Sequence, residues 1–318
     1  MPVASMSAPT NTTRYVCWSS QAPTGWRASG MSPAYGCKAG TIRVRWSCMS
    51  LATAFDVWGG MAIVAAVVAC FVAERRRPLR QRTQPLAERL RTNAAMVALA
   101  ALTLRLAMVP VALAVAVAGE RTGVGLLRWV PLPSAVAAVL AFLLLDWTVY
   151  VWHRLNHRAP LLWRFHLVHH TDLDLDISTA FRFHAGELLL SIAWRGAQIL
   201  LLGVEPGLVL VYEAAMEAAT AFHHSNWRLP TALERGLNVV LVTPRMHGLH
   251  HSVLAAETNS NWSVIFSWWD RLHRTLRGGV PNEALTIGLP AYRDPRGLGV
   301  WRLLALPFER QRNAWVSG

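Results

Sequence analysis

Three long apolar runs constrain what this chain can fold into. They occupy residues 51–73, 93–118 and 134–152. Each approaches or exceeds the roughly 20 residues that a helix needs to cross a bilayer. Two shorter runs, 187–202 and 208–222, flank the sequence GVEPG and predict a helical hairpin. We therefore expect an all-α integral membrane protein with three spanning helices plus a helical hairpin.

The charged residues indicate how such a protein would lie in the membrane. Only 15% of the residues are charged, whereas soluble domains carry about 25%, and arginine supplies almost all of the net charge of +13. Loop 74–92 holds seven arginines and loop 119–133 holds two. The positive-inside tendency therefore places loop 74–92 in the cytoplasm. Because these arginines flank apolar spans, membrane topology explains them better than nucleic-acid binding, and we expect no nucleic-acid partner.

The remaining segments divide the chain into four predicted parts. Residues 1–50 lack periodicity and a signal-peptide layout, so we expect a disordered tail, or an over-extended start with translation beginning at Met49 or Met61. N-terminal membrane helices follow at 51–133, then a catalytic domain at 134–275 and a C-terminal tail at 276–318. The four cysteines show no metal-type pairing; they are Cys17, Cys37, Cys48 and Cys70.

All twelve histidines follow residue 152, and eight of them fall into three groups at helical spacing. Positions i, i+3 and i+4 share one face of a helix. Core histidines that hydrogen bonds satisfy occur singly, so this clustering favours a metal site built from imidazole, which suits iron, zinc, copper or nickel. Eight nitrogens exceed what one ion takes, which predicts two metals. The three groups are His153 and His157; His166, His169 and His170; and His247, His250 and His251.

Two other metal-binding classes fit less well. A zinc protease of the usual type needs His-Glu-x-x-His, which this sequence lacks. A metal transporter places its ligands near the middle of the bilayer. Here the three spans and the positive-inside rule predict that the histidines lie in a helical cap on the cytoplasmic side.

Six ordered blocks between Asp146 and Leu272 carry a family resemblance. They read DWTVYVWHRLNH, LWRFHLVHHTD, TAFRFHAGE, FHHSNWRLP, TPRMHGLHHS and NSNWSVIFSWWDRL. Together they resemble the fatty acid hydroxylase/sterol desaturase superfamily of membrane di-iron enzymes, in its bacterial type. The resemblance implies that the eight box histidines, with His184 and His224, bind the metals. The chain departs from the family at Ala185, Trp262, His273 and Arg274, which weakens any transfer of substrate identity.

Several polar residues in apolar surroundings are candidates for orienting these ligands. Ionisable residues inside a membrane span are costly and usually functional, and a metal-bound imidazole usually donates its other N–H to a carboxylate or carbonyl. A carboxylate paired with an arginine such as Arg195 is the alternative reading. The candidates are Asp146, Tyr150, Glu187, Glu213, Glu217 and His223.

The resemblance implies a non-haem di-iron centre that uses O₂ to hydroxylate a C–H bond of a lipid. The expected cofactors are two iron ions, with zinc as the alternative occupant of purified protein. No Gly-x-Gly-x-x-Gly follows a strand, so the electrons should come from a separate reductase, ferredoxin or cytochrome. We expect the bacterial inner membrane, with the active site facing the cytoplasm. Lipid desaturation is the main alternative, ether-lipid or carotenoid oxidation is a substrate variant, and a non-catalytic metal-binding membrane protein is a further alternative.

Overall fold

The computed structural model describes residues 60–61 and 63–316. In that part of the chain the regular elements are helices, and strand-like pairing is limited to isolated bridges such as Pro78 with Trp227. This confirms the all-α prediction. Residues 63–76 form a helix, but residues 51–59 and 62 of the first predicted span lie outside the described residues.

Three helical segments of the described chain are long and apolar enough to cross a membrane. The first, Leu86–Trp129, contains the predicted run 93–118 and comprises α2 (Leu86–Thr103), the π-helical segment η1 (Leu104–Met108), α3 (Val109–Thr122) and α4 (Leu126–Trp129). The change of helix type precedes Pro110, which has no N–H to donate to the carbonyl of Leu106. The second is α5 (Ser134–Arg158), and the third is α7 (Ala185–Leu202).

The predicted hairpin is formed by α7 and α8 (Pro206–His224). Gly203 ends α7 in the left-handed conformation, with φ of 77°, which glycine adopts without steric cost. A β-carbon on Gly125 would lie 2.1 Å from the Cα of Gly203, so the α3–α4 turn touches the hairpin turn closely. Helix α3 packs against α7 and α8, and α5 packs against the same pair.

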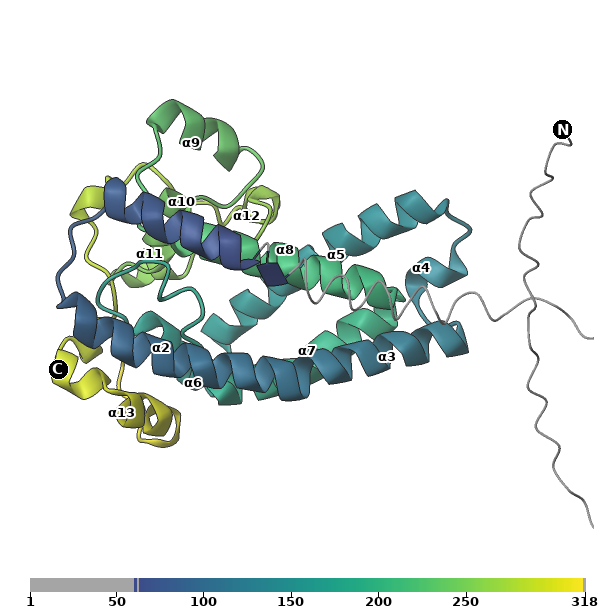
Figure 1. Ribbon diagram of the computed structural model, residues 1–318, viewed down its shortest axis with the longest axis horizontal. Coiled ribbons are helices and arrows are strands. Elements are labelled where there is room, and N and C mark those ends of the chain that lie inside the picture. The colour runs from purple at the N-terminus through teal and green to yellow at the C-terminus, as the bar shows by residue number, and fades with distance from the viewer. Residues whose placement is uncertain (1–59, 62, 317–318) are drawn as a thin grey trace, which may run out of the picture. The chain divides into compact units, whose positions relative to one another are not determined.

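Short helices gather at one end of these long helices (Figure 1). Helix α6 (Pro160–His170) packs on α5 and α7, and α10 (Pro244–His250) packs on α8. The connecting residues form α9 (Thr231–Asn238), α11 (Ala255–Thr258) and α12 (Trp268–Leu272). The placement of this end in the cytoplasm stays a prediction.

The C-terminal residues pack against the helical core. They form η2 (Asn282–Ala284), η3 (Pro290–Tyr292), η4 (Pro295–Leu298), α13 (Val300–Ala305) and η5 (Leu306–Phe308). Leu303 and Leu306 are buried in one cluster with Leu167 and Val168 of α6 and with Met96 of α2. The segment predicted as a tail therefore supports the histidine-bearing helix α6.

Candidate metal centre

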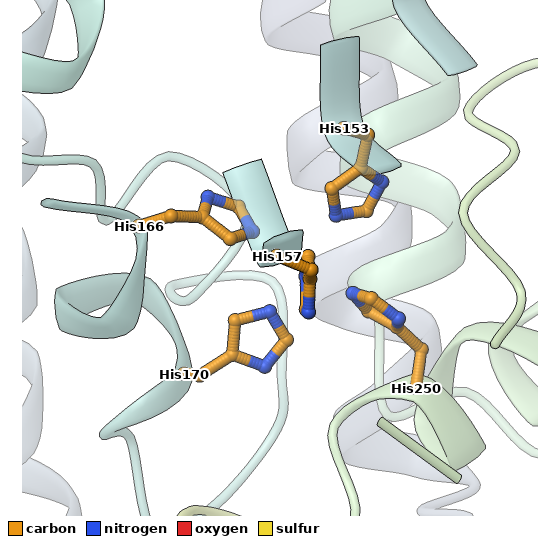
Figure 2. Close-up of side chains that lie close together, drawn as sticks. All are labelled: His153, His157, His166, His170 and His250. Carbon is orange, nitrogen blue, oxygen red and sulfur yellow. The ribbon is translucent and has the colours of Figure 1, made fainter. Parts of the chain in front are cut away.

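Nine histidines form two adjoining groups, and in each group one nitrogen per ring lies within 4.8 Å of the others. Figure 2 shows the rings of the first group pointing toward a common space. We call it the five-histidine group: His153 and His157 from α5, His166 and His170 from α6, and His250 from α10. The four-histidine group consists of His169 from α6, His224 from α8, His247 from α10 and His251 directly after it.

Each His-x-x-His-His box contributes to both groups. In α6 the i and i+4 residues, His166 and His170, join the five-histidine group, and the i+3 residue His169 joins the other. In the second box the assignment is reversed: the i+3 residue His250 joins the five-histidine group, and the i and i+4 residues His247 and His251 join the four-histidine group. Residues i and i+4 lie about 40° apart around a helix, whereas i+3 lies on the other side of i. The spacing of the box thus places ligands toward two neighbouring points.

The nitrogens of the four-histidine group face one another. Nε2 of His224 lies 3.0 Å from Nε2 of both His169 and His247, and Nε2 of His251 lies 3.1 Å from that of His247. Burial lowers the pKa of all four rings, and it lowers the pKa of His224 to about 3. The rings are therefore neutral. Neutral imidazole nitrogens that converge on one point are suited to bind a metal cation.

Hydrogen bonds on the outer side fix the orientation of four rings. Nδ1 of His166 contacts Oε1 of Glu187 at 2.8 Å. The backbone carbonyls of Trp262, Ser260 and Thr220 lie 2.8 to 2.9 Å from Nδ1 of His153, His250 and His224, respectively. Because each Nδ1–H is donated outward, each Nε2 keeps a lone pair for a metal.

Several ring nitrogens of the histidine groups are buried without a hydrogen-bond partner, which bears on whether a metal fits. In the five-histidine group, Nε2 of His166, His170 and His250 and both ring nitrogens of His157 are buried without a hydrogen-bond partner. Buried polar groups are normally satisfied, so unpaired nitrogens in a cluster need an explanation. A cation held by these lone pairs supplies one, and the residues fit a metal.

Two further histidines lie near the groups without joining them. His184 caps the N-terminus of α7: its Nδ1 accepts from the Gly186 N–H at 2.9 Å, and its Nε2 contacts the Leu304 carbonyl at 3.2 Å. Both nitrogens have partners, so the structure does not bring this predicted ligand to the site. The ring of His223, predicted to support the ligands, lies 4.2 Å from that of His247.

Of the polar candidates, only Glu187 hydrogen-bonds to a histidine of either group. Asp146 instead accepts from the backbone N–H groups of Ile265 and Phe266, at 3.3 and 3.1 Å. Tyr150 Oη lies 3.0 Å from Thr275 Oγ1.

The two hairpin carboxylates lie on α8. The Glu213 Oε1 atom lies 3.0 Å from Nε of Arg195. This arginine pairing is the alternative that the sequence left open, and it occurs because Arg195 lies on the neighbouring helix α7. Glu217 lies one helical turn beyond Glu213 on the same helix.

Sequence reasoning missed Asp270 and the backbone carbonyls that orient the ligands. Asp270 is fully buried and accepts from the backbone N–H groups of Trp262 and Ser263, at 3.0 and 2.8 Å. It thereby holds the turn whose carbonyl faces His153. An acidic residue directly after two tryptophans could have indicated a buried role for Asp270, whereas nothing in the sequence marks which backbone carbonyls contact the histidines.

Comparison with known proteins identifies the domain that holds both groups. Residues 138–275 match the model of the fatty acid hydroxylase family. Similar proteins include the ornithine lipid hydroxylase OlsE of Rhizobium tropici, 30% identical over 186 residues (58% of this chain and 54% of that protein). Cholesterol 25-hydroxylase of Rattus norvegicus is 27% identical over 159 residues (49% and 52%). Alkylglycerol monooxygenase of Homo sapiens is 26% identical over 151 residues (47% and 32%).

The chain spans about half the length of the first two relatives. No solved structure matches it. The family match covers every residue of the two histidine groups, and it confirms the resemblance that the six sequence blocks carry. Residues 138–275 of this chain are therefore similar to the fatty acid hydroxylase family.

Proposed function

We propose that this protein is a membrane-bound lipid hydroxylase whose two histidine groups hold two iron ions. The observation that carries the proposal is the pair of adjoining, buried imidazole clusters inside the fatty acid hydroxylase domain. Two irons bound there would supply the activation of O₂ for insertion into a C–H bond. Zinc suits the same nitrogens and is the expected competitor in purified protein.

The protein's own residues hold and shield this centre. Eight box histidines and His224 provide the nitrogens, and burial lowers the pKa of the rings in the four-histidine group, which leaves their lone pairs free to bind a cation. Glu187 and the carbonyls of Trp262 and Ser260 fix three rings in the orientation that points Nε2 inward. Such outer contacts are typical of protein metal sites.

The substrate class follows from what the relatives share. Their names specify an ornithine lipid, cholesterol and an alkylglycerol, which are all lipids. The apolar helices that flank the histidine groups would let a lipid approach from the bilayer. Insertion of one oxygen atom converts R–H, O₂, two electrons and two protons into R–OH and water. We infer that a separate electron carrier delivers the two electrons from the cytoplasm.

An isotope experiment distinguishes hydroxylation from desaturation. Cells that express the protein are grown under ¹⁸O₂, and their lipids are compared by mass spectrometry with those of cells that express His169→Ala. We expect a lipid that gains one ¹⁸O as a hydroxyl and that is absent from the variant. A new double bond without label would indicate a desaturase. Identical lipids in both cultures, with metal bound to the parent protein, would favour a non-catalytic metal-binding protein.

A further inference from the structure

The ring of His223 lies about as close to the rings of the four-histidine group as those rings lie to one another. It is the residue before His224 near the end of α8, and only 2% of its surface is exposed. Its ring centre lies 4.2 Å from that of His247 and 4.7 Å from that of His224. Ring centres within the group are separated by similar distances, 4.2 Å for His224 and His247 and 5.2 Å for His224 and His251.

Like the ligand histidines, His223 has one ring nitrogen with a partner and one without, although the free atom is Nδ1 in place of Nε2. His153, His224 and His250 each place one ring nitrogen against a backbone carbonyl and turn the other inward. His223 has a backbone hydrogen bond to Val264, and its Nδ1 is buried without a partner.

His184 shows the contrasting pattern, because both of its nitrogens have partners outside the two groups. Buried polar nitrogens normally have a partner, and a cation bound in the adjoining four-histidine group would provide one for Nδ1 of His223.

The two groups also differ in the number of nitrogens that they offer. One group has five histidines and the other has four. We propose that His223 supplies a fifth nitrogen to the four-histidine group when a metal is bound. The inference rests on the proposed metal centre. The nitrogens of His223 lie outside the set within 4.8 Å of one another, so binding requires its side chain to rotate toward His224 and His247.

Cobalt binding tests this inference without reference to activity. Full-length protein in detergent is freed of metal and titrated with Co²⁺, which gives visible ligand-field absorption whose intensity rises as the number of donors falls. We expect two cobalt ions per parent chain. His223→Ala should bind the second ion at least about tenfold more weakly, with a more intense spectrum for that ion. His223→Gln keeps the side-chain size and should show the same change.

His273→Ala is the matched control, because His273 lies outside both groups and should leave both ions and their spectra unchanged. If both His223 variants bind two ions with the parent's affinity and spectrum, the inference is wrong and the metal centre stands. Weaker binding with an unchanged spectrum would make His223 a supporting residue and would also overturn the inference. A parent chain that binds fewer than two ions would overturn this inference and the proposed two-metal centre together.

Discussion

Glu187 is the one carboxylate of the described chain that reaches a histidine of the metal centre. Its Oε1 accepts from Nδ1 of His166 at 2.8 Å, and Nδ2 of Asn156 lies 3.4 Å from the same oxygen. The side chain is buried at the start of α7, whereas His166 lies on α6. A carboxylate in this position raises the basicity of the imidazole and prevents the ring from turning.

Replacing Glu187 should therefore weaken metal binding in a graded way. Glu187→Ala removes the acceptor and should lower metal affinity about 10- to 100-fold. Glu187→Gln keeps an amide oxygen as acceptor and should lower it less. Competition with a chromophoric chelator measures the metal affinity of both variants. Glu205→Gln, at an exposed position before α8, is the control. Equal affinity in Glu187→Ala and the parent would show that this hydrogen bond does not support the metal.

At the residue scale, sequence spacing predicted the box histidines but could not separate ligands from capping residues. The resemblance pointed to His184 and His224 alike. Only His224 enters a group, because His184 uses its ring to accept the Gly186 N–H at the first turn of α7. The same imidazole chemistry serves either role, and tertiary packing of α7 against α6 decides which one is adopted.

At the scale of elements, two buried carboxylates organise the irregular segment 262–267 and the start of α12. Asp146, from α5, accepts from Ile265, Phe266 and the indole of Trp269. Asp270, at the other end, accepts from Trp262 and Ser263. Helical periodicity predicts α6 and α10, but the residues between Trp262 and α12 show no such periodicity. Every residue has a backbone carbonyl, so the sequence gives no signal for which carbonyl contacts a histidine. The sequence therefore could not indicate that Trp262 and Ser260 orient ligands.

Asp270→Asn should disturb this segment and the five-histidine group together. The asparagine NH₂ would face backbone N–H donors in place of one carboxylate oxygen, and an unmet buried donor costs about 1–3 kcal/mol. We expect a lower melting temperature and weaker binding of one metal ion, because the Trp262 carbonyl would no longer be fixed against His153. Calorimetry with metal analysis measures both. Asp294→Asn at an exposed site is the control, and unchanged metal binding in Asp270→Asn would exclude the positioning role.

At the scale of the whole described chain, the length of the apolar runs and the arginine content of the loops account for most of the predicted arrangement of helices in the membrane. The runs 93–118 and 134–152 lie within candidate spans, and α7 and α8 form the predicted hairpin. Figure 1 shows α4 and α10 at opposite ends of the long helices. We therefore expect the arginine-poor loop that contains α4 and the histidine groups to lie on opposite sides of a membrane. The positive-inside rule predicts the same arrangement from the arginine counts of the two loops.

Cysteine labelling tests which side holds the metal centre. In a background with Cys17, Cys37, Cys48 and Cys70 changed to serine, Arg271→Cys places a thiol at an exposed position of α12, and Arg121→Cys places one at an exposed position near the end of α3. A membrane-impermeant maleimide added to intact cells should label Arg121→Cys and spare Arg271→Cys, because only the arginine-poor loop faces outward. Both thiols should react after the cells are opened, which controls for accessibility. Labelling of Arg271→Cys from outside would place the histidine groups opposite the cytoplasm, and a cytoplasmic electron carrier could then not reach them.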